Sequence, residues 1–466
     1  MTVPDWVCDS VFYQIFPDRF ADGEPANNPP NVQPWGAPPN IWDFQGGDLA
    51  GIIQRFDYLL DLGVTAIYLN PIFQSTSNHR YNTTDYYRID PKLGKAEDFD
   101  ALLNHAHQHG VRVILDGVFN HCGRGFFAFN DLLENQDHSP YRDWFHVQRF
   151  PVNAYSPGPA ADYLAWWNIK SLPKFNTHNP EVRQYLLDVA RYWIERGADG
   201  WRLDVPNEID DDSFWEAFRQ VVKSANPEAY LVGEIWNADN RWVGEAHFDG
   251  LLNYPLRDYL LRYLHSGTLT ASQFVDKVNG LYSIYPPDNA SVMYNPLGSH
   301  DTERLLTKVE GDITKAKLAF FLQFSFPGAP GIYYGDEIGL LGGKDPDCRR
   351  AFPWDESQWN TTLREWVKKL ISLRKNTPAL RRGDFQTILV DGACPCCVFL
   401  RQLGDESVLV AVNATSSREK LRLPVTKFEW QNGHSGKNLL AGQKYPVRDG
   451  FLELEIDPWD ALWVTH

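Results

Sequence analysis

Short apolar runs alternate with stretches of helical period through the first 380 residues of the chain. Eight runs bounded by turn residues predict strands, at 10–17, 66–72, 111–119, 200–205, 230–236, 250–254, 295–300 and 331–337. Between them, segments such as 96–110 and 179–197 repeat apolar residues at i, i+3 and i+4, which is typical of helices packed on a sheet. Strands that alternate with helices indicate parallel βα units, and eight units predict an α/β fold of the (β/α)8 TIM barrel type.

The segment 179–197 shows the helical pattern most clearly. Its spacing places five apolar residues on one face before a glycine, namely Val182, Tyr185, Leu186, Val189 and Trp193. We expect this face to pack against the barrel.

Two departures from the βα pattern predict further domains. About 80 residues separate the third and fourth predicted strands, far more than a βα connection needs. The segment 121–175 therefore predicts a subdomain inserted over the mouth of a barrel formed by 1–120 and 176–383. From residue 384 the apolar period changes from 3.6 to 2, starting with the run 385–392, and predicts a C-terminal antiparallel β-sandwich at 384–466.

Composition and charge narrow the classes of partner. The 466 residues carry a formal net charge of −16, which argues against nucleic acid and anionic membranes, because phosphate binding needs a basic face. The N-terminus has neither a basic nor an apolar signal region, and no run of about 18 apolar residues occurs. Six cysteines are few for a disulfide scaffold. We expect a cytoplasmic protein that acts on a neutral substrate.

Three carboxylates stand at the predicted ends of different strands, and these are Asp204, Glu234 and Asp301. Side chains at the carboxyl ends of barrel strands converge on one mouth, where such barrels carry out their chemistry. A pair of acids is what cleavage of a glycosidic bond requires. The sequence therefore predicts a glycosidase site at this mouth.

Four segments carry a family resemblance: DGVFNH (116–121), GWRLDVPNE (200–208), GEIW (233–236) and GSHDT (298–302). In this order they resemble the four sequence regions of the α-amylase family of glycoside hydrolases. LPKFN (172–176) and DPDCRR (345–350) are most similar to the subgroup of cyclomaltodextrinases, maltogenic amylases and neopullulanases. The resemblance covers essentially the whole chain, and it implies no organic cofactor.

The resemblance assigns a role to each acid: Asp204 is the nucleophile, Glu234 the general acid and base, and Asp301 the carboxylate that holds sugar hydroxyls. A retaining mechanism needs one ionised and one protonated carboxyl close together. Arg202 lies two residues before Asp204 on the same strand and face, so its charge is expected to keep Asp204 ionised. The charge of Asp301 is expected to keep the proton on Glu234.

The resemblance also implies a substrate-binding set, consisting of Tyr81, His121, Arg202, His300, Asp345 and Arg349. Asp116 and Asn120 are expected to brace the site. Trp236 is equally consistent with the barrel core and with a wall of the sugar site. Asn237 stands where the subgroup often has His, on the side of the leaving group.

The loops FADGEPANNP (20–29) and GGDL (46–49) are rich in oxygen donors and predict a structural Ca²⁺ site. The expected ligands are Asp22, Asn27, Asn28, Asp48 and the carbonyl of Gly46. Subgroup members resembling this chain have a calcium loop here, but Glu24 stands where they typically have Asp. A turn rich in Asn and Asp that binds no metal remains the alternative.

The sequence thus predicts a retaining hydrolase of α-1,4 and α-1,6 links in maltooligosaccharides, cyclodextrins, pullulan or branched dextrins, with some transglycosylation. An oligo-1,6-glucosidase or a glucanotransferase on the same scaffold is the first alternative. A catalytically inactive homologue that only binds or scaffolds is the second. The N-terminal β-sandwich of many subgroup members is not expected, so their dimer cannot be assumed, and the oligomeric state stays open, a homodimer included.

Overall fold

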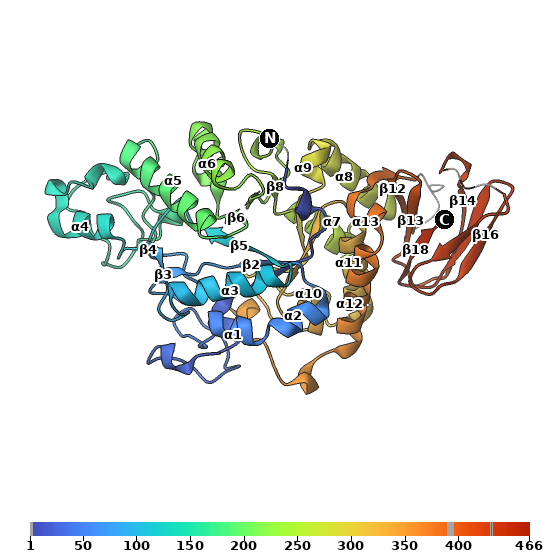
Figure 1. Ribbon diagram of the computed structural model, residues 1–466, viewed down its shortest axis with the longest axis horizontal. Coiled ribbons are helices and arrows are strands. Elements are labelled where there is room, and N and C mark those ends of the chain that lie inside the picture. The colour runs from blue at the N-terminus through green and yellow to red at the C-terminus, as the bar shows by residue number, and fades with distance from the viewer. Residues whose placement is uncertain (1–2, 389–395, 429, 431) are drawn as a thin grey trace.

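The computed structural model describes residues 3–388, 396–428, 430 and 432–466. The end of the predicted run 385–392 and Cys394 lie outside these described residues. The protein consists of a central barrel, a lobe inserted into it and a C-terminal β domain (Figure 1).

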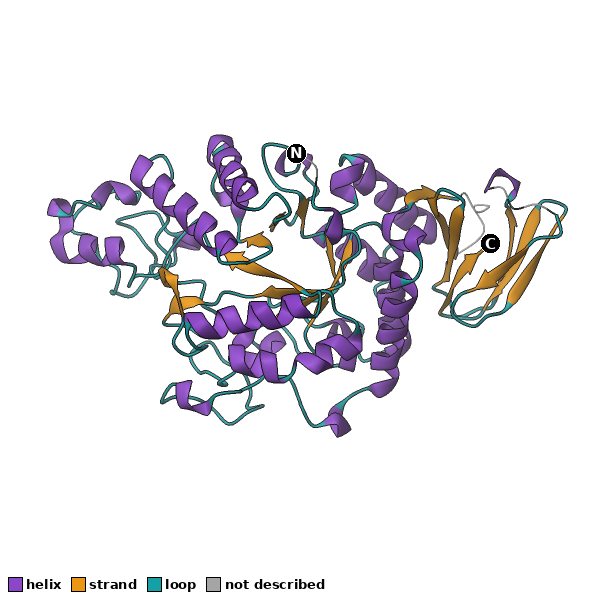
Figure 2. Ribbon diagram, in the orientation of Figure 1, coloured by secondary structure: helices purple, strands orange, loops and turns teal. Residues whose placement is uncertain are grey.

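A parallel sheet of eight strands forms the barrel in the described chain (Figure 2). The strands are β1 (Phe12–Ile15), β2 (Ala66–Leu69), β5 (Arg112–Gly117), β6 (Gly200–Leu203), β7 (Tyr230–Gly233), β8 (Gly250–Leu251), β9 (Tyr294–Pro296) and β10 (Ala329–Tyr333). They follow the order β8-β7-β6-β5-β2-β1-β10-β9, and a parallel bridge between Leu252 and Tyr294 closes the ring. The (β/α)8 prediction is confirmed.

Helices surround the barrel on its outer side (Figure 1). They are α1 (Leu49–Gln54), α2 (Phe56–Leu62), α3 (Ala96–Gln108), α5 (Pro180–Glu195), α6 (Asp212–Ala225), α7 (Tyr254–Leu264), α8 (Ala271–Ser283), α9 (Pro287–Ala290), α10 (Leu305–Lys308), α11 (Ile313–Ser325), α12 (Thr361–Lys375) and α13 (Pro378–Arg382). Among the described residues, no helix combines the length and the apolar character that crossing a membrane requires.

Helix α5 illustrates how the sequence sets these elements. Asn179 caps its N-terminus by accepting hydrogen bonds from two backbone N–H groups, and Pro180 occupies the first helical position. Four of the five predicted face residues are buried, and Tyr185 is partly buried against the same core. The helix ends before Gly197, whose φ of +114° a residue with a side chain rarely adopts.

Several strands are shorter than their apolar runs predicted. Strand β9 ends at Pro296 and β8 has only two residues, so His300 and Asp301 lie in a loop beyond the sheet. A short hairpin of β3 (Phe73–Ser75) and β4 (Thr83–Ile89) after β2 was not predicted. Beyond β9, His300 contacts the side chains of Gln14 and Tyr81 instead of continuing the ladder.

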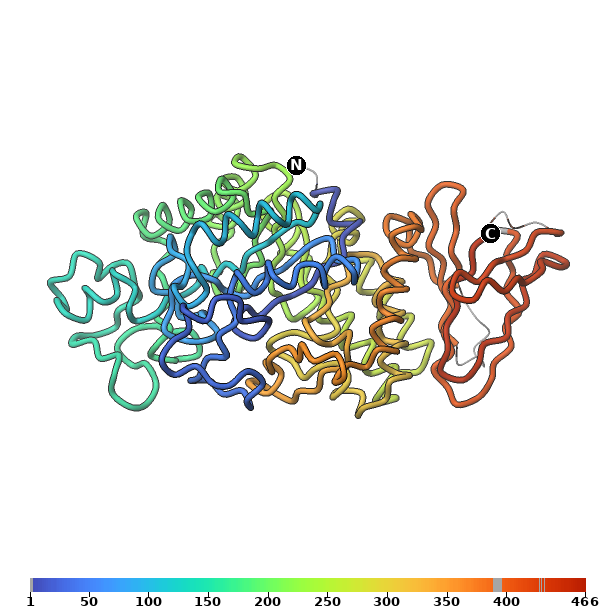
Figure 3. Tube along the Cα trace, turned by 60° about the horizontal axis from the view of Figure 1, so that its bottom comes forward, coloured from blue at the N-terminus to red at the C-terminus, as the bar shows by residue number. Residues whose placement is uncertain are grey.

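The segment between β5 and α5 forms a lobe with one longer helix, α4 (Phe127–Asn135). An isolated antiparallel bridge pairs His121, shortly after β5, with Lys174 at the other end of the lobe, and a second bridge pairs Ala165 with Pro173 inside the lobe. Figure 3 shows this lobe and the C-terminal domain at opposite ends of the molecule.

The C-terminal domain is an antiparallel arrangement of eight described strands. These are β11 (Asp384–Thr387), β12 (Cys396–Leu403), β13 (Glu406–Asn413), β14 (Glu419–Pro424), β15 (Ser435–Asn438), β16 (Lys444–Arg448), β17 (Phe451–Ile456) and β18 (Asp460–Thr465). Alternate residues of β12 face two cores: Val398 and Leu400 join the core of the domain, and Phe399 joins the core of the barrel. The predicted β domain is therefore present and packs directly on the barrel.

Candidate active site

The three predicted acids lie at one end of the barrel. Asp204 follows β6, Glu234 follows β7 and Asp301 lies in the loop after β9. Because all barrel strands are parallel, their carboxyl ends share one mouth, and the side chains that follow them converge there.

Arg202 links the acids. Its side chain is 1% exposed, and its Nη1 lies 2.8 Å from Asp116 Oδ1 and 3.0 Å from Asp204 Oδ1. Its Nη2 lies 3.0 Å from Glu234 Oε2. A single guanidinium therefore holds Asp204 and Glu234 next to each other, which is the arrangement that a two-carboxylate mechanism needs.

Val205 and Trp236 also donate hydrogen bonds to the carboxylate of Glu234. The backbone N–H of Val205 donates to Glu234 Oε2 at 3.0 Å, while Trp236 Nε1 donates to Oε1 at 3.2 Å. Val205 has a φ of 36°, a left-handed conformation that a β-branched residue rarely adopts. This strained turn points the N–H toward Glu234, and nothing in the sequence predicted it.

The acid cluster retains a proton near neutral pH. Burial raises the pKa of Asp204 well above its usual value despite Arg202, and the charge of Glu234 adds to the effect. Burial and, to a lesser extent, the negative charge of Glu234 raise the pKa of Asp301 to about 7. Both raised values belong to carboxyls that share the buried mouth with Glu234, whose Oε2 accepts from Arg202 and from Val205 N. The proton belongs to the cluster as a whole.

Asp301 is held from two sides. His300 Nε2 lies 3.1 Å from Asp301 Oδ2, and Arg349 Nη2 lies 3.4 Å from Oδ1. Arg349 also pairs with Asp345 at 3.1 Å and donates to the carbonyl of His300 at 2.9 Å. The predicted pair Asp345 and Arg349 thus lies beside the third acid.

Tyr81 stands next to His300 and Asp116. The two rings are stacked with centroids 5.5 Å apart, and the Tyr81 hydroxyl lies 2.6 Å from His300 Nε2. The same hydroxyl donates to Asp116 Oδ2 at 2.8 Å. Asn70 Nδ2 also donates to the hydroxyl at 3.1 Å, a contact that sequence reasoning missed because Asn70 follows an ordinary barrel strand.

The histidines of the mouth are neutral. Burial lowers the pKa of His121 to about 3 and that of His79 to about 3, where Arg349 adds to the effect. Burial and Arg349 lower the pKa of His300 well below its usual value. Neutral imidazoles offer one donor and one acceptor each, which suits sugar hydroxyls rather than anions.

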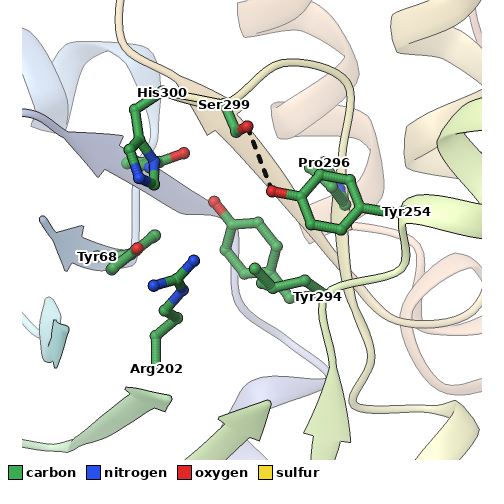
Figure 4. Close-up of a pocket in the computed structure, with 9 residues that line it drawn as sticks. Tyr68, Arg202, Tyr254, Tyr294, Pro296, Ser299 and His300 are labelled. Carbon is green, nitrogen blue, oxygen red and sulfur yellow. Dashed lines mark hydrogen bonds between the residues drawn. The ribbon is translucent and has the colours of Figure 1, made fainter. Parts of the chain in front are cut away.

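A pocket in the barrel is lined by the residues drawn in Figure 4, and two of these residues contact the acid cluster. Arg202 and His300 line it together with aromatic rings, among them Tyr254, whose hydroxyl donates to Ser299 Oγ at 3.3 Å. The Trp236 ring stacks on Tyr254 at 3.8 Å and is 47% exposed. Trp236 is therefore a wall of the site and not barrel core, and Tyr254 escaped sequence reasoning because it begins a helix.

The oxygen-rich loops after β1 are joined by Asp48. Its carboxylate caps α1 through Gly51 N at 2.6 Å and accepts from Gly23 N, Glu24 N and Asn27 Nδ2 at 3.1, 2.9 and 2.9 Å. Burial nevertheless raises the pKa of Asp48. A buried carboxylate of this kind is stabilised further by a nearby cation.

Two amide oxygens of this loop suit a cation. Asn27 Oδ1 and Asn28 Oδ1 are buried and have no hydrogen-bond partner. A Cβ built on Gly46 would lie 2.4 Å from Asn28 Oδ1, so the Gly46 backbone passes directly beside this oxygen. Asp22 accepts from Asn28 Nδ2 at 2.9 Å, whereas Glu24 accepts from Ala26 N in its own turn. The five predicted ligands are therefore close together and fit a hard cation.

Comparison with known proteins agrees with this geometry. A family model described as the alpha amylase catalytic domain matches residues 14–383. A cyclomaltodextrinase of Geobacillus thermopakistaniensis is 46% identical over 459 residues, which are 98% of this chain and 76% of that relative.

Among the solved structures that match the chain over its full length and theirs are two enzymes with related activities in their names. The cyclic alpha-maltosyl-(1→6)-maltose hydrolase of Arthrobacter globiformis superimposes with a TM-score of 0.91 at 40% identity. The debranching enzyme of Nostoc punctiforme superimposes with a TM-score of 0.90 at 40% identity. The chain is an enzyme and belongs to the α-amylase family of glycoside hydrolases.

Proposed function

We propose that this enzyme hydrolyses α-1,4 and α-1,6 bonds of short or branched α-glucans with retention of configuration. The observation that carries the proposal is the shared contact of Asp204 and Glu234 with Arg202, at 3.0 Å each. A retaining glycosidase has its two carboxyls about 5–5.5 Å apart, and a common guanidinium keeps them adjacent.

In the proposed first step, Asp204 attacks the anomeric carbon of the scissile sugar. The bond to the leaving oxygen breaks, and this oxygen takes the cluster's proton from Glu234, so a glycosyl ester on Asp204 and a free hydroxyl result. In the second step, Glu234 removes a proton from water, the water oxygen bonds to the anomeric carbon, and Asp204 leaves as a carboxylate.

The remaining side chains position the sugar in this scheme. Asp301 and the Asp345–Arg349 pair offer fixed acceptors and donors for hydroxyls, and Tyr81 offers a ring face beside His300. His121 Nε2 is buried without a hydrogen-bond partner, so a sugar hydroxyl would satisfy it.

The substrate classes are inferred from the relatives. Their names include a cyclomaltodextrinase, a hydrolase of a cyclic maltosyl-maltose with 1→6 links and a debranching enzyme. We therefore infer cyclodextrins and branched dextrins as substrates. A product profile from β-cyclodextrin, pullulan and a branched oligosaccharide, with the anomer followed by NMR, tests the proposal; first products of β configuration, or no cleavage of any of the three, would refute it.

We further propose that Ca²⁺ binds the loop of Asp22, Asn27, Asn28, Gly46 and Asp48 and stabilises the fold. Chelation is then expected to lower the Tm by roughly 5 °C, because a ligand that binds only the native state adds to its stability. Differential scanning calorimetry with and without a chelator, together with elemental analysis of the purified protein, measures this.

Gly46→Ala provides the control, since its Cβ would displace Asn28 Oδ1. This variant should have a lower Tm that no longer responds to the chelator. Absence of Ca²⁺ from the purified protein, combined with an unchanged Tm, would speak against the site.

Asn237→His is expected to shift the ratio of α-1,6 to α-1,4 cleavage several-fold, with a smaller effect on the sum of both rates. Asn237 is exposed and follows Trp236, which contacts the acid Glu234, so a change here alters the side where the leaving group departs. Product analysis on a branched oligosaccharide measures the ratio. Asn240→His, an exposed neighbour on the same loop, should leave it unchanged, and an equal shift in both variants would contradict the assignment.

A further inference from the structure

A column of three stacked rings leads outward from the mouth of the barrel. The His121 and Trp166 rings have centroids 5.7 Å apart with planes at 24°, and Trp166 and Trp167 are 4.5 Å apart at 8°. Trp167 ends the column and is 75% exposed. The column therefore presents a flat aromatic face to solvent close to the imidazole of His121.

The column is fixed to the barrel. The backbone of His121 forms an isolated antiparallel β-bridge with that of Lys174, and Cys122 N donates to the carbonyl of Pro173 at 3.1 Å. Trp166 N donates to the carbonyl of Leu172 at 2.9 Å. The segment that carries both tryptophans is thus hydrogen-bonded to the strand end that carries His121, so the rings keep their distance from the acids.

The backbone that presents Trp167 is strained. Trp167 has φ 48° and ψ 28°, and Asn168 has φ 59°, so two successive residues with side chains are left-handed. Hydrogen bonds from Asn168 N to the carbonyl of Ala165 at 3.0 Å and from Ala160 N to the carbonyl of Asn168 at 2.8 Å hold this turn. Folding gains little from an exposed indole, and strain of this kind concentrates at binding sites.

We propose that the exposed face of Trp167 is a binding platform for an additional glucose ring of the same α-glucan, beyond the ring that is cleaved. The inference rests on the proposed function. A pyranose has an apolar face of C–H groups that can cover a flat aromatic ring, and the quadrupole of the ring attracts those hydrogens. The stack on Trp166 fixes the plane of the indole before the sugar arrives, which reduces the entropy lost on binding.

The surroundings of the column favour a neutral polyol over a charged ligand. Burial keeps His121 neutral by lowering its pKa to about 3. Lys174 is paired with Glu208 at 3.0 Å, and Lys170 donates to the carbonyl of Ser156 at 3.0 Å. Of these two cations, Lys174 is neutralised by a carboxylate, and Lys170 is held by the two oxygens of Ser156.

The test compares chain lengths. Trp167→Ala should lower kcat/KM about 3- to 10-fold on maltohexaose, mainly through KM, and leave a chromogenic maltoside with one aryl leaving group unchanged. Trp167→Phe should recover part of the loss. Trp167→Gly, which relieves the strained φ, should match Trp167→Ala in activity and have an equal or higher Tm.

Tyr155→Ala is the matched control, because Tyr155 is 68% exposed on the same lobe but is not part of the column. It should leave all substrates unaffected. Equal losses on the short and the long substrate, or equal losses in Tyr155→Ala and Trp167→Ala, would overturn the platform. If the unmodified enzyme cleaved neither substrate, the proposed function itself would fail, which is a different result from a loss confined to the variants.

Discussion

Asp204→Asn and Glu234→Gln are each expected to lower kcat by about four orders of magnitude while the fold persists. Each substitution keeps the shape of the side chain and removes one half of the two-carboxylate mechanism. The Arg202 guanidinium still has an oxygen to bond in both variants, so circular dichroism and Tm should stay close to the unmodified enzyme. Initial rates on β-cyclodextrin, with single-turnover rates for the chemical step, measure the loss.

The two variants are distinguished by their response to the leaving group. A substrate with an activated aryl leaving group needs no proton donor, so it should restore the first step in Glu234→Gln and not in Asp204→Asn. A slow 2-fluoro glycosyl donor should label Asp204 covalently, and peptide mass mapping identifies the residue. Asp239→Asn, an acid five residues beyond Glu234 that caps a short turn, should keep full activity. Labelling of Glu234, or near-normal rates in either variant, would reverse or remove the assignment.

Strand ends could be located from sequence because they combine an apolar run with an acid. Asp204 and Glu234 follow directly on such runs, and the parallel barrel brings them to one mouth whatever the details of its loops. Arg202 could be placed beside Asp204 by the period of a strand alone. These predictions needed only the pattern of apolar residues along each strand and the rule that the carboxyl ends of barrel strands share one mouth.

Contacts between loops could not be predicted in this way. The left-handed Val205, the Tyr254–Trp236 stack and the column ending at Trp167 arise from packing between segments far apart in the sequence. No periodicity marks them, since each residue sits outside a regular element or begins one. The same reason explains why the predicted strand at 295–300 was too long: Asp301 and its neighbours bond to side chains across the mouth and leave the ladder.

The distribution of the proton was also beyond sequence reasoning. The raised pKa values of Asp204 and Asp301 come from burial, and the donors on Glu234 Oε2 come from Arg202 and from the backbone of Val205. Which carboxyl holds a proton depends on each hydrogen bond and on water access, and neither follows from spacing along the chain. The number of acidic groups at the mouth could be predicted from the sequence, whereas their burial and their hydrogen bonds required the structure.

Arg202→Met is expected to destabilise the native state by about 3–5 kcal/mol at pH 8, because three buried carboxylates lose the cation that they share. Asp116, Asp204 and Glu234 each lie within 3.0 Å of this guanidinium. Methionine fills a similar volume without the charge, so the effect reports the ion pairs more than a cavity. Urea unfolding followed by fluorescence at several pH values measures it.

The sign of the pH dependence follows from the raised pKa values. A carboxyl whose pKa is higher in the native than in the unfolded state favours folding at low pH, and this stability is lost as pH rises through the native pKa. For Asp301 that window runs from its usual value to about 7, and Asp204 is raised as well. Without Arg202 nothing offsets the cost of burying an ionised Asp204, so Arg202→Met should approach the unmodified enzyme at pH 5 and fall furthest behind at pH 8. Arg202→Lys keeps a charge and should recover much of the stability but little of the turnover, since one ammonium cannot hold both acids in the guanidinium geometry.

A loss of stability in Arg202→Met that is equal at pH 5 and pH 8 would show that Arg202 contributes packing rather than charge.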